Sequence, residues 1–488
     1  MRTRTAVATA LAIGGMVAPV ALAGTPITGD VPVNTTTDGA QEFHSIAASD
    51  GGYVVAWIDE LDAVRAQRFD GSGAKAGGEI LVAEGQVYSV DVAAWPDGRF
   101  VVVWHEFSSG PSDEVRARIY SAAGDPLSDI IEVNTTTAEN QKYPTVSIAP
   151  DDGSFVVAWD DDSTFTLMLT ARRFAATGTP ITDELDLGHE GNADTQVVAQ
   201  SGGSFVVAWT SADDALFRRF DGNGTGLTQA ADVTGDPGNE ADRPVIARGP
   251  GDTIVAAWEQ LGDAYWRRFG ADLTPVAGRS PAHSNLPGSQ PASGIGAAAD
   301  GRAVVAWEQV DESRYRRFGA DGAAITEELA ANADAAGGQE FPDVAVQPDG
   351  DFGIAWTDND DGIEARFFTT PEGSGTSPSP NPNPSPPPPN PSPPLQQPLP
   401  PLDAPEFSDF VTFSSNKRCV KRINLRVKGA SKITARIKGK KVATKVKHEL
   451  VIKKLPQGRF KLKVTVVSKG GQTFKGARSF KRCARPKK

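Results

Sequence analysis

Acidic side chains recur shortly after each copy of a repeated tryptophan, and these carboxylates are the residues of the 488-residue chain best suited to chemistry. The candidates for a ligand-binding face are Asp59, Glu60, Glu106, Asp160, Asp161, Asp213, Asp214, Glu259, Glu308, Asp358 and Asp360. Carboxylates beside amides and hydroxyls are groups with which proteins bind sugars and Ca²⁺. The pattern is compatible with a glycan or peptide site, a Ca²⁺ site, glycosidase-type acid catalysis, or a polar rim that contacts only solvent.

Signatures of other chemistries are absent from the sequence. The five histidines fall at unrelated positions of the repeat: His44, His105, His189, His283 and His448. The chain contains no His-Glu-x-x-His, no Gly-rich phosphate loop and no Gly-x-Ser-x-Gly. We therefore predict no catalytic residue, no resident cofactor and no enzyme, with Ca²⁺ kept as an alternative for the acidic face.

Seven tryptophans indicate the scaffold that must position these acids. The repeat contains Trp57, Trp104, Trp159, Trp209, Trp258, Trp307 and Trp356, which lie 47, 55, 50, 49, 49 and 49 residues apart. Each ends a short apolar run, and strand-rich units of this period are typical of propeller blades. The sequence predicts an all-β, seven-bladed β-propeller over residues 24–370, with a β-solenoid as the alternative.

Each repeat is expected to contain four strands. In the first copy they span residues 43–48, 52–57, 64–69 and 79–82, and Asp50-Gly51 forms the first turn, because both residues tolerate positive φ. The loops after the tryptophans and the Asn-, Thr- and Gln-rich segments between blades should open on one face. That arrangement would gather the acidic residues there.

An arginine before an apolar residue of the third strand is the second recurring feature. The set comprises Arg68, Arg118, Arg173, Arg219, Arg268, Arg317 and Arg366. A symmetric hairpin predicts that Trp57 lies opposite Arg68 and Trp104 opposite Arg118. Each guanidinium would then cover an indole face, an interaction worth about 0.5–2 kcal/mol.

The N-terminal residues predict how the ring closes. The last repeat ends before its fourth strand, whereas residues 25–30 repeat residues 179–184, and Val33-Asn34-Thr35 repeats Val133-Asn134-Thr135. We therefore expect residues 25–34 to form the outer strand of the seventh blade, which removes an open sheet edge.

These motifs resemble a known repeat family. The pattern Asp-Gly-(Gly/Ser/Arg)-Phe-Val-Val-Ala-Trp, followed by Ala-Arg-Arg-Phe and Val-Asn-Thr, resembles the tandem repeat of large secreted bacterial surface and toxin-like proteins, over residues 25–368. The resemblance implies a β-propeller and export, and it implies no catalytic residues.

The first 23 residues predict export. Arg2 and Arg4 precede an apolar stretch over residues 6–21, and Ala21-Leu22-Ala23 matches a cleavage site. A signal peptide over residues 1–23 is the preferred interpretation, and an uncleaved membrane anchor is the alternative. No other run has the roughly 20 apolar residues of a transmembrane helix. We expect an extracellular or cell-envelope-associated protein without a transmembrane segment.

Composition changes twice after the propeller. Residues 371–405 are predicted to be a linker, because 15 of the 30 residues from 376 to 405 are proline and such tracts form semi-rigid spacers. Residues 406–488 hold 26 of the 49 Lys and Arg residues and three of the 61 acidic residues. This gives a formal charge of +23, against −35 for the rest of the chain.

The basic segment has the pattern of half-buried strands. Phe460, Leu462, Val464 and Val466 alternate with polar or charged residues, as residues do in a strand with one buried face. Cys419 and Cys483 bracket the segment and predict a disulfide in an exported protein. The segment resembles the small immunoglobulin-like β-sandwich domains that end many secreted bacterial proteins.

These features favour a non-enzymatic binding or scaffold protein. Its propeller face would recognise a polysaccharide or protein ligand, and its basic domain would dock on an anionic cell-envelope polymer. Lys outnumbers Arg in that domain by 18 to 8, which favours point-charge attraction over sequence-specific nucleic-acid binding. Two alternatives stay open: a glycan-active hydrolase or lyase on the propeller face, and a purely structural spacer or assembly part.

Overall fold

The computed structural model describes residues 24–371 and the strands between residues 411 and 481. Within these limits the description leaves out residues 36–40, 60–62, 108–111, 163–167, 191–193, 212–213, 236–240, 285–289, 310–311, 335–337, 359–361, 415–422, 428–429, 438–439, 446–448, 453–458 and 469–472. The chain divides into two compact units, Met1–Pro380 and Asn381–Lys488. The predicted signal peptide and nearly all of the predicted linker lie outside the described residues.

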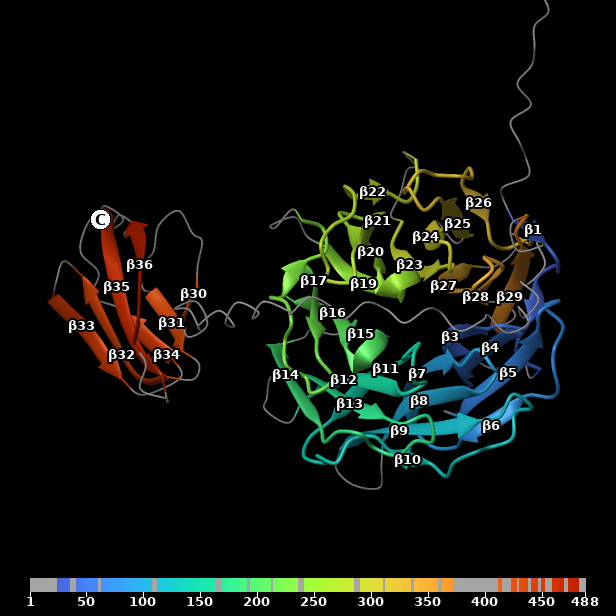
Figure 1. Ribbon diagram of the computed structural model, residues 1–488, viewed down its shortest axis with the longest axis horizontal. Coiled ribbons are helices and arrows are strands. Elements are labelled where there is room, and N and C mark those ends of the chain that lie inside the picture. The colour runs from blue at the N-terminus through green and yellow to red at the C-terminus, as the bar shows by residue number, and fades with distance from the viewer. Residues whose placement is uncertain are drawn as a thin grey trace, which may run out of the picture. The chain divides into compact units, whose positions relative to one another are not determined.

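Seven antiparallel sheets form a β-propeller (Figure 1). Blade 1 contains β3 (Glu42–Ser49), β4 (Gly52–Ile58), β5 (Val64–Asp70) and β6 (Ile80–Ala83), in agreement with the strands predicted for the first repeat. Blade 2 contains β7 (Val87–Ala94), β8 (Phe100–Phe107), β9 (Asp113–Tyr120) and β10 (Ile131–Glu132). Blade 3 contains β11 (Gln141–Ile148), β12 (Phe155–Asp161), β13 (Met168–Phe174) and β14 (Leu185–Glu190).

The remaining blades repeat this order. Blade 4 contains β15 (Gln196–Ala199), β16 (Phe205–Ser211), β17 (Asp214–Phe220) and β18 (Ala231–Asp232). Blade 5 contains β19 (Ala241–Arg248), β20 (Ile254–Gln260), β21 (Asp263–Phe269) and β22 (Ser280–Pro281). Blade 6 contains β23 (Ala292–Ala297), β24 (Ala303–Gln309), β25 (Glu312–Phe318) and β26 (Leu329–Ala330), and blade 7 contains β27 (Gln339–Val346), β28 (Phe352–Asp358) and β29 (Gly362–Thr369). Two 3-10 turns, Ser201–Gly203 and Pro250–Asp252, follow β15 and β19.

The first strand of each blade lies nearest the centre of the ring, as Figure 1 shows for β3, β7, β11, β15, β19, β23 and β27. Each repeated tryptophan lies in the second strand and is buried between two blades. Trp104 packs with Val54 and Val64 of blade 1, and Trp57 packs with Ala355 and Ile363 of blade 7. Burial of seven indoles removes a large apolar area from water, so the tryptophan repeat supplies the cores that hold adjacent blades together.

The predicted opposition of tryptophan and arginine is wrong. Trp57 pairs with Arg65, and Arg68 pairs with Val54. In blade 4, Trp209 pairs with Leu216 and Arg219 with Val206. The second strand continues past the tryptophan, and the hairpin loop is shorter than the sequence prediction requires. In both blades the residue opposite the tryptophan is therefore three positions before the predicted arginine. An odd shift reverses the face of a strand residue, so Arg68 and Arg219 lie on the opposite side of their blades from the indole. In blade 2, Trp104 pairs with Arg116, so Arg118 is displaced by two residues from the predicted pairing and lies on the same side as the indole.

The seven arginines also occupy two structural positions rather than one. Arg68, Arg173, Arg219, Arg268 and Arg317 directly precede the aromatic residue that ends the third strand, whereas Arg118 and Arg366 lie two residues before it. In blades 3 to 6 both positions hold arginine, which hides the distinction from a comparison of the repeats alone.

The arginine two residues before the aromatic makes the cation–π contact. The Cζ atom of Arg172 lies 5.5 Å from the ring centre of Phe174, so the partner is this phenylalanine rather than a tryptophan. Its Nε donates to the carbonyl oxygen of Thr182 (3.1 Å), and its Nη1 donates to that of Val133 in the preceding blade (2.8 Å). This guanidinium therefore joins two blades as well as covering a ring.

The prediction that residues 25–34 close the ring is confirmed. Strands β1 (Thr25–Pro26) and β2 (Val31–Pro32) both pair with β29, with Thr25 opposite Thr369 and Val31 opposite Ala365. The backbone N–H of Ile27 donates to the carbonyl oxygen of Phe367 (2.9 Å). The outer edge of blade 7 is thus covered by the beginning of the propeller chain.

The C-terminal unit contains strands only, among its described residues. One sheet has the order β30 (Val411–Ser414), β31 (Ile423–Val427), β34 (Glu449–Ile452), and the other has the order β33 (Lys440–Lys445), β32 (Ala430–Ile437), β35 (Arg459–Ser468), β36 (Thr473–Lys481). In β35, Leu462 and Val464 are buried while Lys463 is exposed, as the alternating pattern predicts. Cys419 and Cys483 lie outside the described residues, so their disulfide stays a prediction. No helix in the described part of the chain is long and apolar enough to span a membrane.

Candidate functional site

The predicted acidic face is defined by topology. In every blade the inner strand begins, and the second strand ends, at the same end of the ring, which we call the upper face. The turns between first and second strands lie at the opposite, lower face. The loops after the tryptophans and the segments between blades therefore share the upper face, as the sequence predicts.

Most of the predicted acidic residues that the structure describes are engaged within the protein. Asp59 accepts hydrogen bonds from the backbone N–H of Ala63 (3.0 Å) and from Nε of Arg65 (2.5 Å). Glu106 accepts from Nε1 of Trp104 (3.0 Å) and forms an ion pair with Arg116 (3.2 Å). These carboxylates stabilise their own hairpins. Their role here is structural, and they are not presented for ligand binding.

Two further acids hold the glutamines that begin inner strands. Nε2 of Gln141 donates to Oδ1 of Asp161 (2.9 Å), while Oε1 of Gln141 accepts from Nε1 of Trp159 (2.7 Å). Nε2 of Gln339 likewise donates to Oδ2 of Asp358 (2.7 Å). A chain of bonds from acid to glutamine to tryptophan thus fixes the start of an inner strand relative to its neighbour.

Asp160 is the predicted acid with the most unusual environment. It is fully buried, and its Oδ1 accepts from Oγ1 of Thr195 (2.6 Å), whereas Oδ2 has no hydrogen-bond partner among the described residues. Burial raises the pKa of Asp160 to about 6; the Thr195 hydrogen bond opposes this shift and the Asp194 carboxylate adds to it. Burial also raises the pKa of Asp194, with a further contribution from Asp242.

The other predicted acids are more exposed or fall outside the described residues. Glu259 is half-buried, has a pKa raised by burial and by Asp242, and lies 3.8 Å from Nη1 of Arg243. Asp214 and Glu308 are also half-buried. Glu60, Asp213 and Asp360 lie outside the described residues. Among the described residues there is no group of three metal-ligating side chains.

Exposed aromatic side chains on the upper face form the feature that the sequence interpretation missed. Phe43, Tyr88, Tyr143 and Phe341 are 57%, 44%, 45% and 56% exposed, and each lies in the first residues of an inner strand. They belong to four consecutive blades, 7, 1, 2 and 3, and we call them the aromatic collar. Phe107, the other strongly exposed aromatic in the described part of the chain, ends β8 on the same face.

Irregular backbone presents the collar. Each of the four residues lies at a break in the pairing of first and second strands, as between Lys142 and Thr145 in blade 3. Phe43, Tyr143 and Phe341 adopt φ values of 51°, 50° and 54°. A bulky residue in this left-handed region is strained, and such strain concentrates where a side chain must be presented for function.

The buried His105 contacts two residues of the collar. The ring of His105 lies between Tyr88 and Tyr143, at centre-to-centre distances of 5.6 Å and 5.4 Å. Its Nδ1 accepts from the backbone N–H of Tyr143 (3.3 Å) and lies 2.6 Å from Oγ of Ser89. Since a backbone N–H only donates, the neutral ring carries its proton on Nε2. Burial, together with the charge of Lys142, lowers the pKa of His105 to about 4.

Carboxylates cover the strand edges deeper in the channel. Asp343 accepts from the backbone N–H of Ile46 in the next blade (3.0 Å), and Asp91 accepts from that of Val146 (2.8 Å) and from Oγ of Ser45 (2.8 Å). Burial raises the pKa of Asp343 to about 7. These side chains satisfy backbone donors at the inner edges of blades 1 and 3, where no further strand can pair.

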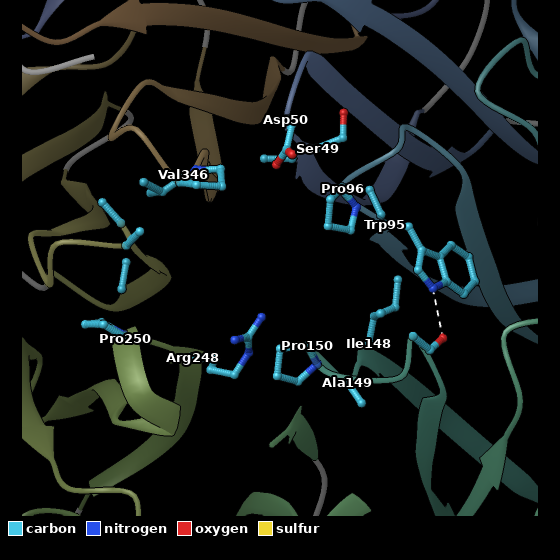
Figure 2. Close-up of a pocket in the computed structure, with 18 residues that line it drawn as sticks. Ser49, Asp50, Trp95, Pro96, Ile148, Ala149, Pro150, Arg248, Pro250 and Val346 are labelled. Atoms are coloured by element: carbon cyan, nitrogen blue, oxygen red, sulfur yellow. Dashed lines mark hydrogen bonds between the residues drawn. The ribbon is translucent and has the colours of Figure 1, made fainter. Parts of the chain in front are cut away.

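The lower face has a cavity of different character. It has a volume of about 400 Å³ and is lined by the ends of inner strands and their turns. Figure 2 shows Ser49, Trp95, Pro96, Pro150 and Arg248 around its open centre, with Trp95 bonded through Nε1 to the carbonyl oxygen of Gly153 (2.9 Å). Among the described residues that line it, Asp50 and Arg248 are the only charged ones. This cavity lacks the paired polar groups that catalysis or specific binding requires.

A sequence signal for the collar exists. Gln41-Glu42-Phe43, Gln86-Val87-Tyr88, Gln141-Lys142-Tyr143 and Gln339-Glu340-Phe341 share a Gln-x-aromatic pattern at the start of four repeats. The glutamine is buried and the aromatic is exposed in the first, third and fourth of these. The pattern is short, and its meaning depends on a bulge that the sequence does not reveal.

The comparisons with known proteins identify no family for this chain. No family model matches the chain, and no curated protein matches it. Solved structures do match, among them a protein of unknown function from Dyadobacter fermentans DSM 18053, at 11% sequence identity and a TM-score of 0.43. That alignment covers 70% of this chain and 98% of the other.

Proposed function

We propose that the protein is an exported, non-enzymatic binding protein that uses the upper face of its propeller to recognise a ligand at the outside of the cell. The observation that carries this proposal is the aromatic collar on strained bulges. Exposure of aromatic rings to water is unfavourable, and a left-handed backbone at a bulky residue is strained. Both features favour a binding role over a rim that contacts only solvent. The predicted signal peptide and the resemblance to secreted bacterial repeat proteins support export.

The C-terminal unit has a second role in this proposal. The +23 charge of residues 406–488 would attach the protein to an anionic polymer of the cell envelope, and the proline-rich linker would separate that anchor from the recognition face. An immunoglobulin-like sandwich closed by Cys419 and Cys483 is the arrangement we propose for this unit. The crosslink would offset part of the mutual repulsion among its cations.

The alternative of a glycan-active enzyme has one observation in its favour, the buried Asp160 with a raised pKa near Asp194. Acid catalysis needs a carboxyl group that can reach the substrate. Asp160 is fully buried and bonded to Thr195, so the binding role is favoured.

The test is retention of the full chain on cell-envelope fractions and on immobilised glycans and peptides, with product release followed in parallel. We expect retention without turnover, and weaker retention for the double variant Phe43→Ala/Phe341→Ala. Leu227→Ala is the matched control, because Leu227 is also exposed but lies in the outer part of blade 4. Release of cleaved products would support the enzyme, and retention that ignores the collar would contradict the proposed recognition face.

A further inference from the structure

We propose that the ligand of the aromatic collar is an uncharged polysaccharide, bound by stacking of its sugar rings on Phe43, Tyr88, Tyr143 and Phe341. This inference rests on the proposed recognition role and adds the chemical class of the ligand. Three properties of the upper face lead to it: the presentation of the rings, the sign of the charges beside them, and the closure of the strand edges below them.

The two tyrosine rings of the collar pack against a buried histidine. His105 packs against both Tyr88 and Tyr143, and the backbone N–H of Tyr143 is fixed to His105. His44 follows Phe43 in the chain, and its Nε2 lies 3.2 Å from the carbonyl oxygen of Ala355 in blade 7. Nδ1 of the same ring lies 3.2 Å from Oγ1 of Thr357. Tyrosine rings packed in this way lose little freedom on binding, and aromatic faces match the apolar C–H faces of sugars better than they match flexible chains.

The charges beside the collar disfavour an anionic polymer. The two cations on the neighbouring bulges are paired with carboxylates: Lys142 lies 3.7 Å from Asp113, and Arg243 lies 3.8 Å from Glu259. Asp194 and Asp242 add two carboxylates on blades 4 and 5, so the excess charge of the described upper face is negative. Like charges across an interface cost affinity, so sulfated or uronic-acid polymers are disfavoured at this face.

The strand edges below the collar are closed to an extended peptide. A peptide that adds a strand needs free backbone N–H and C=O groups along an edge. Asp343 occupies the N–H of Ile46, and Asp91 occupies that of Val146, on the inner edges of blades 1 and 3. Recognition above them must therefore use ring faces and hydroxyl groups, which is the way sugars are bound.

The experiment measures binding of the full chain to soluble neutral polysaccharides (a β-glucan, an α-glucan and a mannan) by affinity electrophoresis. Alginate and a library of cationic peptides serve as comparison ligands. We expect at least one neutral polysaccharide to bind at 0.3 M salt. Each of Phe43→Ala, Tyr88→Ala and Phe341→Ala should weaken binding roughly threefold to tenfold, the range for one aromatic contact. Leu227→Ala and the conservative Tyr88→Phe should bind as the unaltered chain does.

The possible outcomes separate this inference from the proposed function. Collar-dependent binding of peptides, or of alginate, with no neutral polysaccharide bound, would overturn the inferred ligand class and leave the recognition face standing. Binding of every ligand unchanged by all three alanine variants, with their melting temperatures unaltered, would overturn both.

Discussion

Arg366 donates its Nε to the carbonyl oxygen of Thr28, 3.4 Å away, across 338 residues of chain. The same bond joins Arg172 to Thr182, Arg218 to Thr228 and Arg316 to Thr326, each within one blade. Thr28 therefore occupies the structural position that the blade's own outer segment fills elsewhere. The outer segment of blade 7 thus comes from the other end of the sequence but takes the same place in space as in the other blades. The same arginine-to-threonine hydrogen bond therefore joins the two ends of the propeller.

Deletion of residues 25–34 should lower the melting temperature of the propeller by roughly 10 °C or more, because it exposes the edge of β29. It also removes Asp30, whose Oδ2 accepts from the backbone N–H groups of Ala333 (2.6 Å) and Asp334 (2.8 Å) in the adjacent blade. Differential scanning calorimetry of the full chain measures the effect, with the exposed Ile27→Ala as the control. Unchanged melting of the deletion variant would show that closure at this edge is dispensable.

Replacement of Arg172 by Met should reduce the free energy of unfolding by about 1–3 kcal/mol, since the carbonyl oxygens of Thr182 and Val133 lose a charged donor. Trp209→Ala serves as the reference for a large effect, because loss of a buried aromatic should lower the free energy of unfolding by about 3–5 kcal/mol. Arg99→Met is the control, because Arg99 covers Trp95 but its ion pair with Asp97 is largely exposed. Urea denaturation compares the three, and equal losses for Arg172 and Arg99 would refute the inter-blade role.

Much of this fold could be predicted from the sequence, because the signals are local and repeated. Seven Trp-terminated apolar runs, five of them preceded by an Asp-Gly turn, predict the blades, and the copied Thr-Pro-Ile-Thr segment predicts the closing strand. The register could not be predicted, since it depends on how far β4 continues beyond Trp57. The sequence prediction treated the two arginine positions, one and two residues before the aromatic of the third strand, as a single position. Blades 3 to 6 carry arginine at both, so the repeats alone do not separate them.

The candidate site was less accessible to sequence analysis. The acids stand out by composition, yet Asp161 and Asp358 bind glutamines of the scaffold. Phe43 and Phe341 look like ordinary strand residues, and only the bulge that turns them to solvent distinguishes them. Exposure of an aromatic at an irregular strand depends on tertiary structure, which a pattern of alternating residues does not encode.

The strain at the collar can be measured with two variants of one residue. Phe341 has a φ of 54°, where glycine is favoured over alanine by about 1 kcal/mol or more. Phe341→Gly should therefore be more stable than Phe341→Ala by that amount, while both lose the same ligand contact. Thermal unfolding and binding of the full chain are measured together. Equal stability of the two variants would mean that the bulge relaxes and that the ring is not held under strain.

The stability of the protein should carry the signature of the buried Asp160. Its pKa of about 6 lies above its unfolded value near 3.8, so the folded state holds the proton more tightly. The contribution of Asp160 is most favourable below about pH 4 and is lost as the pH rises through 6. Asp160→Asn removes this loss. The free energy of unfolding of the variant, relative to that of the unaltered chain, should therefore rise between pH 4 and pH 7.5 by on the order of 2–3 kcal/mol.

Urea denaturation at a series of pH values tests this, and the difference between the two proteins is the informative quantity. Burial lowers the pKa values of His44 and His105 to about 4, so both destabilise the fold as the pH falls below 6.5. Their contribution is common to both proteins and cancels in the difference. A difference that stays constant across the range would show that folding does not raise the pKa of Asp160.

The C-terminal unit should bind anionic polymers in a way that salt controls. Its cations are mainly lysines, and Lys463 is exposed between the buried Leu462 and Val464 on β35. Binding by such point charges releases counterions, so the logarithm of the association constant should fall linearly with the logarithm of salt concentration. The full chain applied to a sulfated resin should elute above roughly 0.15 M salt, where the screening length is about 8 Å.

A neutral resin of the same matrix separates this attraction from collar binding, because the collar variants should leave the salt gradient on the sulfated resin unchanged. Lys463→Gln should lower the elution position slightly, since one cation among 26 is removed. Elution of the unaltered chain below about 0.15 M salt would reject the docking role, because attraction that fails at physiological screening cannot hold the protein on an envelope polymer. The basic unit would then act only as a highly charged, soluble appendage of the propeller.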